Sequence, residues 1–308
     1  MTKKPHGCQP FFLKKIKCSK VIYILFFLVD YLGMSVSADG FFNLRGKVAM
    51  VTGGGHGLGL DIASALASAG CDVIITSRIF EKAEAVAGGL RSQYGGQVLA
   101  LGLDQRDPAH VAECFSGVAS WVRKAAHPKG RLDILVNNAG GGASSGPTNF
   151  FERRAEDIEE MISVNLTGMI FCCQQAARIM AGQRSGKIIN ISSVAALVGR
   201  GRQLYHDTGL AEQAVDYAAA KAGVLGLTRD LAAVLAPYNA QVNAISPGGF
   251  EKNQPPAFIA GYSALTMLGR MGQLGSDIKG VALFLASSAS DYVTGQNLVV
   301  DGGFSAVK

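Results

Sequence analysis

The 308-residue chain lacks several patterns that mark well-known protein classes. It has no internal repeat at a period of roughly 20–50 residues and no low-complexity tract, which argues against a solenoid or a fibre. It has no Gly-x-x-x-x-Gly-Lys-Ser/Thr sequence, which argues against the phosphate loop of a phosphoryl-transfer enzyme.

The chain also lacks a cysteine framework. Its cysteines are scattered, with no Cys-x-x-Cys pair and no metal-ligand spacing, so no metal site is predicted. Two of them are adjacent on a predicted helix, where they would pair badly in a disulfide. We therefore expect reduced thiols and a reducing compartment. The six cysteines are Cys8, Cys18, Cys71, Cys114, Cys172 and Cys173.

Net positive charge is concentrated in the first 33 residues. The formal net charge is +6, but residues 1–33 carry six lysines and one acid, Asp30, and so account for +5 of it. The remainder of the chain is close to neutral. It lacks the basic surface that nucleic-acid binding requires, and no nucleic-acid partner is expected.

Residues 1–33 are interpreted as an extension outside the functional protein. Their apolar run, Val21–Val29, ends at Asp30 and is too short to span a bilayer comfortably. No clean signal-peptidase site follows it. The alternatives are a targeting or anchoring segment, or ordered structure, and membrane association is expected only if the segment is retained as an anchor. The functional domain is predicted to cover residues 34–308.

From Lys47 onward, short apolar runs alternate with helical stretches. This alternation indicates an α/β fold, a single Rossmann-like, doubly wound parallel sheet with helices on both faces. Ligands of such sheets bind at the carboxyl ends of the strands. The predicted strands lie within 47–52, 72–77, 97–104, 132–138, 186–193, 240–248 and 297–303, and the predicted helices within 59–70, 80–94, 108–126, 155–182, 214–236 and 274–287.

A glycine-rich loop, TGGGHGLG, joins the first predicted strand to the first predicted helix at residues 52–59. Glycines at this place let the backbone approach a pyrophosphate, and the following helix offers free N–H groups to it. The spacing does not fit Gly-x-Gly-x-x-Gly, because Leu58 and Leu60 occupy the final positions of the two possible frames. A plain tight turn is the alternative interpretation.

The motif Thr-Gly-x-x-x-Gly-x-Gly resembles the cofactor loop of the short-chain dehydrogenase/reductase family. Further motifs of that family follow in order over residues 44–304, with Asn137-Asn138-Ala139-Gly140, Asn165, Ser193, Tyr217-x-x-x-Lys221 and Pro247-Gly248. The resemblance implies four catalytic residues, Asn165, Ser193, Tyr217 and Lys221. It implies cofactor contacts from Gly53, Gly57, Leu58, Gly59, Ser77, Arg78, Asp104, Asn138, Ala139, Gly140, Tyr217, Lys221, Pro247 and Gly248.

A nicotinamide enzyme that reduces a ketone must deliver a hydride to carbon and a proton to oxygen. Tyr217 is predicted to carry the proton. A free tyrosine has a pKa of about 10, and Lys221, one helical turn away, is expected to lower it. The resemblance implies that Lys221 also holds the nicotinamide ribose, that Ser193 donates to the substrate oxygen and that Asn165 anchors a water beside Lys221.

Three nearby residues have weaker assignments. Ser192 is expected to support the strand end. Asn137 and Asn138 have the same two alternatives: each either fixes local structure or takes part in the site. Asp104 is expected near the adenine, or alternatively as an acid that starts the next helix.

The end of the second predicted strand favours NADP(H) over NAD(H), although NAD(H) is possible. An acid there would bind the 2′-hydroxyl of NAD, and Ser77 stands in its place. Arg78 can pair with a 2′-phosphate through its planar guanidinium. A solvated arginine is the alternative.

Two segments depart from the family pattern. Ser193 and Tyr217 lie about twice as far apart as usual, which indicates an insert around residues 199–212. It is predicted to be either a surface loop or a contact for a polar substrate. After Pro247-Gly248 the usual threonine is missing, and a backbone group or Asn253 is the candidate replacement. Residues 249–272 are predicted to form a substrate lid.

The predicted function is interconversion of a secondary alcohol and a ketone with NAD(P)H, on a small polar substrate such as a sugar or sugar acid. The chain as a whole, including the insert and the run SPGGF…NQP, resembles gluconate 5-dehydrogenase-like and surface-sugar biosynthesis members of the family. The alternatives are a 3-oxoacyl thioester reductase and a non-catalytic dinucleotide-sensing regulator. The resemblance further implies a homotetramer or homodimer, and NADP(H) use favours a cytoplasmic location.

Overall fold

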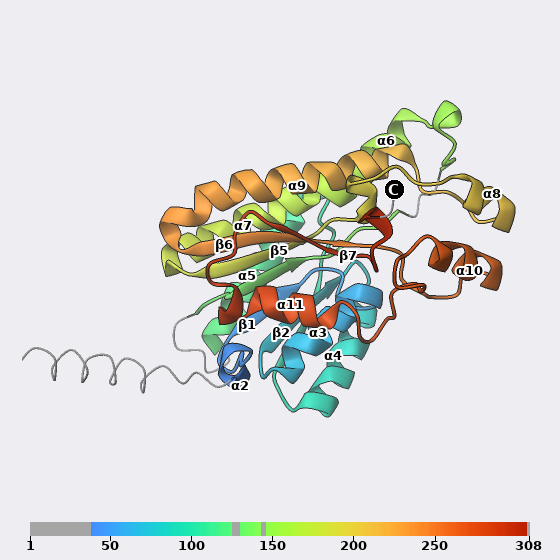
Figure 1. The fold of residues 1–308 in the computed structure, drawn as a ribbon. Coiled ribbons are helices and arrows are strands. Elements are labelled where there is room, and N and C mark those ends of the chain that lie inside the picture. The colour runs from blue at the N-terminus through green and yellow to red at the C-terminus, as the bar shows by residue number, and fades with distance from the viewer. Residues whose placement is uncertain (1–37, 125–129, 143–145, 307–308) are drawn as a thin grey trace, which may run out of the picture. The chain divides into compact units, whose positions relative to one another are not determined.

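The computed structural model describes residues 38–124, 130–142 and 146–306 (Figure 1). The chain divides into two units, the second of which begins at Phe42. The described part of the first unit is the short helix α2 (Ala38–Phe41), and the predicted extension at residues 1–33 lies outside the described residues. No helix within the described ranges is long and apolar enough to cross a membrane.

The second unit contains a seven-stranded, all-parallel sheet in the order β3-β2-β1-β4-β5-β6-β7. This confirms the predicted doubly wound α/β fold. The central strand β1 pairs with β2 on one side and β4 on the other, so the strand order reverses there. The strands are β1 (Val48–Val51), β2 (Asp72–Ser77), β3 (Val98–Gly102), β4 (Ile134–Asn137), β5 (Gly186–Ile191), β6 (Ala240–Pro247) and β7 (Asn297–Val300).

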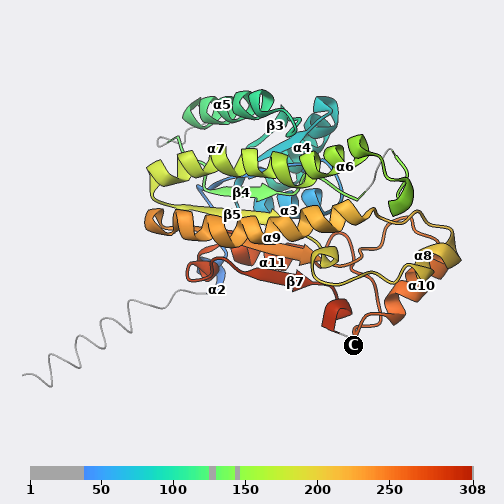
Figure 2. The same cartoon turned by 90° about the horizontal axis from the view of Figure 1, so that it is seen from above.

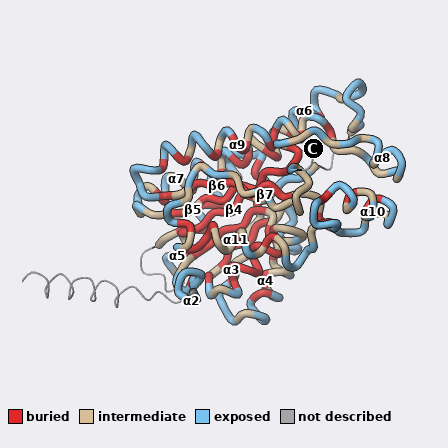
Figure 3. The backbone as a smooth tube through the Cα atoms, in the orientation of Figure 1, coloured by how far each residue is buried: buried red, intermediate tan, exposed pale blue. Residues whose placement is uncertain are grey.

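Helices cover both faces of the sheet (Figure 2). Three of them, α3 (Gly57–Ser68), α4 (Phe80–Tyr94) and α11 (Lys279–Ala286), share one apolar cluster with the sheet. The helices α5 (Pro108–Lys124), α7 (Gly168–Gln183) and α9 (Val215–Leu235) share the cluster on the opposite face. The inner strands are buried along their length (Figure 3), because β-branched and aliphatic side chains meet a helix on either side.

The predicted helix 155–182 contains an irregular turn. It consists of α6 (Ala155–Ile162), a π-helical segment at Ser163–Thr167, and α7. A β-carbon on Gly168 would lie 2.6 Å from the Gln105 carbonyl oxygen, so α7 passes very close to the loop after β3. Single π turns within helices often occur at functional sites, and this one carries Asn165.

Two further helices lie beyond the carboxyl ends of the strands. The helix α8 (Gln203–Thr208) belongs to the insert, and α10 (Pro256–Ala264) belongs to the predicted lid segment. They pack against each other beyond that carboxyl end of the sheet (Figure 1). Residues 274–278, predicted as the start of the last helix, form turns instead, and α11 begins at Lys279.

Candidate active site

The glycine loop runs from the end of β1 to the start of α3. Gly57 has a φ of +55° and a β-carbon there would meet no atom within 4 Å, so open space lies over the helix start. Gly59 has no such space, because a β-carbon would come within 2.3 Å of the Gly53 carbonyl oxygen. His56 precedes the helix and its side chain makes no capping bond. Uncapped N–H groups beside open space fit an anion such as a pyrophosphate.

Asn138 joins the glycine loop to the end of β4. Its side-chain amide donates to the carbonyl oxygens of Thr52 (3.0 Å) and Gly53 (3.1 Å). In return the Thr52 hydroxyl accepts the backbone N–H groups of Asn138 and Ala139, both at 3.0 Å. Asn137 is buried instead and donates to the Asn190 side chain at 2.9 Å. Both asparagines therefore fix local structure. Asn138 also lines the cavity beyond the ends of β5 and β6 that is described below.

A first cavity lies over the ends of β2 and β3. Its lining includes Ser77, Arg78, Lys82 and Asp104, together with His56 from the glycine loop. The Ser77 hydroxyl accepts the Ile79 N–H at 3.2 Å. The site presents two cationic side chains and a hydroxyl at the end of β2, where a carboxylate would repel a phosphate. These residues fit a phosphorylated ribose.

Asp104 lines this cavity but is engaged by a neighbour. The Arg106 Nε lies 2.9 and 3.1 Å from its two carboxylate oxygens. That bond is the main reason why the pKa of Asp104 is below its usual value. The alternative that Asp104 starts the next helix is wrong, because α5 begins at Pro108 and the Ala109 N–H donates to Asp107 at 2.8 Å.

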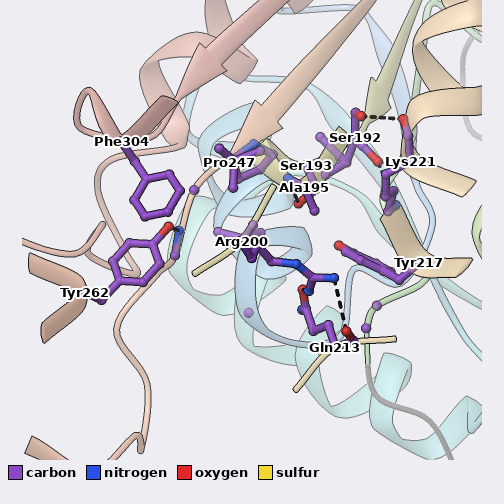
Figure 4. A pocket seen from close by; sticks show the side chains of 18 of the residues that line it. Ser192, Ser193, Ala195, Arg200, Gln213, Tyr217, Lys221, Pro247, Tyr262 and Phe304 are labelled. Atoms are coloured by element: carbon purple, nitrogen blue, oxygen red, sulfur yellow. Dashed lines mark hydrogen bonds between the residues drawn. The ribbon is translucent and has the colours of Figure 1, made fainter. Parts of the chain in front are cut away.

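A second cavity, of about 270 Å³, lies beyond the ends of β5 and β6. It shares His56, Asn138, Gly140 and Gly141 with the first, so the two adjoin. Ser193, Tyr217 and Lys221 all line it, together with Pro247 and Gly248 after β6 (Figure 4). The structure thus brings these sequence-predicted residues together, although Ser193 and Tyr217 come from different elements.

Ser193 follows β5 and starts a short 3₁₀ turn. Its hydroxyl accepts the Ala195 N–H at 3.1 Å, which fixes the side chain toward the cavity. Ser192, one residue earlier, also lines the cavity, and its hydroxyl donates to the Lys221 carbonyl oxygen at 2.8 Å. Ser192 thereby joins the strand end to α9, which agrees with its predicted supporting role.

Tyr217 lies in the first turns of α9 and is buried. Burial raises the pKa of its phenol, while hydrogen bonding with Ser193 and the charge of Arg200 act in the opposite direction. The predicted lowering of this pKa is wrong for this structure, because the pKa is raised overall. The cation whose charge opposes the rise is Arg200, which faces the tyrosine from the insert (Figure 4).

Lys221 is buried one helical turn beyond Tyr217. Its ammonium donates to the Ile191 carbonyl oxygen at 2.9 Å and lies 5.8 Å from the centre of the Tyr217 ring. Burial lowers the pKa of Lys221 to about 8. A lysine with this pKa exchanges protons far more readily near neutral pH than an exposed one does.

Asn165 lines the first cavity rather than the second. Its Oδ1 accepts the Gly141 N–H at 2.9 Å, and its Nδ2 donates to the carbonyl oxygens of Gly141 and Met161, both at 3.1 Å. These bonds fasten the loop after β4 to the π-helical segment. The role of Asn165 in anchoring a water beside Lys221 stays a prediction.

The insert lines the second cavity. Arg200, Gly201, Leu204, Tyr205 and Gln213 all contribute to its wall. The insert is a helix, α8, with flanking segments, and the Tyr205 ring packs edge-on against Phe258 of α10 at 5.1 Å. The insert therefore forms part of the wall of the site, and its contact with a polar substrate stays a prediction.

Backbone hydrogen bonds join the two ends of the predicted lid segment. The Gly272 N–H donates to the Gly249 carbonyl oxygen (2.9 Å), and the Glu251 N–H donates to the Gly272 carbonyl oxygen (2.7 Å). The Tyr262 hydroxyl accepts the Gly249 N–H at 2.7 Å, and its ring stacks on Phe304 at 4.8 Å. Lid closure itself stays a prediction.

Asn253, the candidate replacement for the missing threonine, does not line either cavity, whereas Tyr262, Lys252 and Gly249 line the second one. Sequence reasoning missed Arg200, Gln213, Tyr262 and Phe304 as individual residues of this site. The unusual length of the insert was the signal for the first two. No group of three or more His, Cys, Asp or Glu side chains suited to a metal ion occurs in the described part of the chain.

Comparisons with known proteins agree with this architecture. A family model described as enoyl-(acyl carrier protein) reductase matches residues 53–305. The 3-oxoacyl-(acyl-carrier-protein) reductase FabG of Aquifex aeolicus is 36% identical over 264 residues, which cover 84% of this chain and 98% of the relative. The 2-dehydro-3-deoxy-D-gluconate 5-dehydrogenase of Dickeya dadantii is 37% identical over 277 residues, which cover 86% and 98%.

A solved structure is similar over nearly the same range. It is a gluconate 5-dehydrogenase from Burkholderia cenocepacia in complex with NADP and tartrate. The two share 34% sequence identity with a TM-score of 0.76, over 88% of this chain and all of the other.

Proposed function

The chain belongs to the short-chain dehydrogenase/reductase family, and from this premise we propose that it interconverts a secondary alcohol and a ketone with NADP(H). One observation carries the proposal. Ser193, Tyr217 and Lys221 line the second cavity, which adjoins the first cavity over the ends of β2 and β3. A dinucleotide bound along both cavities would bring its reactive ring next to these three side chains.

The bound nicotinamide supplies or accepts the hydride, and the residues of the chain handle the proton. Tyr217 donates it to the carbonyl oxygen in reduction and removes it from the hydroxyl in oxidation. Ser193 donates a hydrogen bond to the same oxygen as negative charge develops there. Lys221, with its pKa of about 8, binds the ribose hydroxyls and takes part in proton exchange with Tyr217.

The cofactor proposed is NADP(H), with Arg78 and Lys82 on the 2′-phosphate and Ser77 beside it. The NADP complex of the Burkholderia relative supports this assignment. Replacing Arg78 by Ala should raise the Kd for NADPH by roughly 10–100-fold, because a charge-assisted hydrogen bond contributes about 1.5–3 kcal/mol. The Kd for NADH should change much less. Equal changes for both cofactors, or a wild-type preference for NADH, would contradict the assignment.

The substrate proposed is a small polar hydroxy or keto compound such as a sugar acid. The second cavity is lined by two charged side chains, Arg200 and Lys252, and by the polar side chain of Gln213. The gluconate dehydrogenases among the relatives support this class. The resemblance to FabG of Aquifex aeolicus makes a 3-oxoacyl thioester reductase the second candidate.

A panel of sugar acids, polyols and 3-oxoacyl thioesters, followed at the NADPH absorbance, tests the proposal. We expect turnover of at least one member by the wild-type chain and at least about 100-fold less by Tyr217→Phe. A dinucleotide-sensing regulator would instead bind NADPH in calorimetry and turn over no member of the panel. Full activity in Tyr217→Phe would exclude the proposed proton donor.

We further propose a homotetramer or homodimer with α7 and α9 at an interface. Ile170 on α7 and Val234 on α9 are large apolar residues that are exposed in the single chain, by 40% and 57%. Sedimentation equilibrium gives the mass directly. A monomer at micromolar concentration would exclude the assembly.

A further inference from the structure

Arg200 is a half-buried cation with no carboxylate at ion-pair distance among the described residues. Its guanidinium donates to the side-chain oxygen of Gln213 and to the carbonyl oxygens of Gln213 (3.1 Å) and Ala214 (3.3 Å). All three acceptors are neutral. They fix the side chain without balancing its charge, and burial lowers the pKa of Arg200.

Arg202, two residues along, provides the contrast. It is bonded to the carboxylate of Glu212, which His206 also contacts at 2.8 Å. Glu212 is therefore paired with Arg202 and His206, and Arg202 does not line the cavity. Of the two arginines of the insert, only Arg200 lines the cavity, and it has no ion-pair partner among the described residues.

The remaining wall does not supply a counter-charge. The described residues that line the second cavity include Arg200, Lys221 and Lys252, but no Asp or Glu. Figure 4 shows the Arg200 guanidinium directed toward Gln213 and the Tyr217 side of the cavity. A guanidinium has five N–H donors in a planar fork, and the bonds described above use three of them.

We propose that Arg200 is a specificity-determining residue that binds the carboxylate of the substrate. This inference rests on the proposed function and narrows its substrate class to hydroxy and keto acids. The N–H groups that Gln213 and Ala214 do not use, on Nε and Nη1, donate to the carboxylate, and the bonds to Gln213 and Ala214 keep the guanidinium in position. The reacting hydroxyl then lies between Tyr217 and Ser193, with the carboxylate on the insert side.

The same charge argues against the second candidate substrate. In a 3-oxoacyl thioester the group one methylene away from the reacting ketone is a neutral thioester. Such a substrate would leave Arg200 half-buried without a counter-charge, whereas a carboxylate would pair with it.

Two substrates that differ only in charge test the proposal, D-gluconate and its neutral analogue D-gluconamide. The wild-type chain, Arg200→Gln and Arg202→Gln are compared for kcat/KM with NADP⁺. In Arg200→Gln we expect kcat/KM for gluconate to fall by roughly 10–100-fold, mainly through KM, as for the loss of a charge-assisted bond. The value for gluconamide should stay within about threefold, and Arg202→Gln should leave both substrates nearly unchanged.

Binding of the two compounds is measured separately by calorimetry on the NADP⁺ complex of Tyr217→Phe, with and without Arg200→Gln. This arm separates the inference from the proposed function, because it decides the role of Arg200 even if no turnover is found. Tighter binding of gluconate than of gluconamide that disappears with Arg200→Gln supports the inference. Equal losses for both compounds, or no preference for gluconate in the parent chain, would overturn it.

A pH profile excludes a purely positioning role. Because the charge of Arg200 acts on the phenol of Tyr217, Arg200→Gln should shift the pH dependence of kcat equally for the acid and the amide. The additional loss in kcat/KM at each pH should be confined to gluconate, and a loss of the same size for gluconamide would overturn the inference.

Discussion

The two halves of the site are built in different ways. The cofactor half, defined as the glycine loop at 52–59 with the ends of β2, β3 and β4, relies on backbone groups and short side chains. Thr52 and Asn138 fix it with four hydrogen bonds between adjacent strand ends. The substrate half, defined as segments 199–214 and 249–272, relies on long side chains. The rings of Tyr205, Phe258 and Tyr262 contact one another in that order, and Tyr262 stacks on Phe304 from the C-terminal segment.

This difference separates what can vary from what cannot. A backbone contact such as that between Gly59 and Gly53 leaves no room for another side chain. A wall of long side chains can change residue by residue while the sheet below it is kept. The cofactor half should therefore be sensitive to any change of shape, and the substrate half should mainly set which substrate is accepted.

The largest expected effect separates chemistry from both halves. Tyr217→Phe removes the proton donor while the ring and the contacts of the cofactor half remain. We expect kcat/KM to fall by about 10²–10⁴-fold, the usual contribution of a general acid or base. The Kd for NADPH, measured by fluorescence titration, should change less than about threefold. A comparable loss of NADPH affinity would mean that Tyr217 belongs to the cofactor half instead.

Lys221 lies where the halves meet, and its burial predicts a pH-dependent stability. Its pKa falls from 10.5 to about 8 on folding, so between these values the unfolded chain binds more protons than the folded one. The wild type should therefore gain stability relative to Lys221→Met as the pH rises through this window. The expected gain is about 3 kcal/mol, and below pH 8 the difference should be constant.

Urea unfolding of wild type and Lys221→Met at pH 7, 8.5 and 10 measures that difference. Because both proteins share every other titrating group, only Lys221 contributes to it. A difference that does not change with pH would show that the ammonium is not desolvated in the folded chain.

A smaller effect tests the tight packing of the cofactor half. In Gly59→Ala the new methyl group would meet the Gly53 carbonyl oxygen and the Asn138 amide, at 2.3 and 2.4 Å. We expect a loss of about 1–3 kcal/mol in the free energy of unfolding. NADPH should bind more weakly, because the loop must shift.

Gly89→Ala in α4 is the matched control. A β-carbon at Gly89 would meet no atom within 4 Å, so this substitution should stabilise the helix by about 0.5–1 kcal/mol. Equal behaviour of the two variants in thermal unfolding and NADPH titration would contradict the close contact at Gly59.

The smallest effect concerns the substrate half. Tyr262→Phe leaves the ring stack on Phe304 but removes the acceptor of the Gly249 N–H. We expect a loss of about 0.5–1.5 kcal/mol of stability, the usual net contribution of one hydrogen bond. The KM for the substrate should rise and the Kd for NADPH should stay constant. A change in NADPH affinity alone would remove the distinction between the halves at this position.

Regular elements were predicted closely because their patterns are local. The helix at 80–94 and the strand at 72–77 have the predicted bounds, since apolar periodicity and terminal polar residues specify both. The π turn that carries Asn165 was not predicted. It depends on the close passage of Gly168 by the Gln105 carbonyl, a contact between residues far apart in the chain.

The electrostatic details were the least predictable part of the site. Asp107 rather than Asp104 caps α5, because Arg106 already engages Asp104. Arg200 rather than Lys221 offsets part of the rise in the pKa of Tyr217, because the insert brings Arg200 to the tyrosine while the Lys221 ammonium donates to Ile191. Spacing along one helix gives the neighbours of Tyr217 on α9, but not those that other elements bring to it.

Local patterns and the spacing between strand ends were enough to predict the parallel sheet and the cofactor loop. They were also enough to predict the ordered set of Ser193, Tyr217 and Lys221. The place of the insert in the wall of the substrate cavity, with Arg200 facing Tyr217, became known only from the three-dimensional structure. A helix of six residues, α8, has little stability alone and takes its position from α10 and the aromatic stack, which no local pattern encodes.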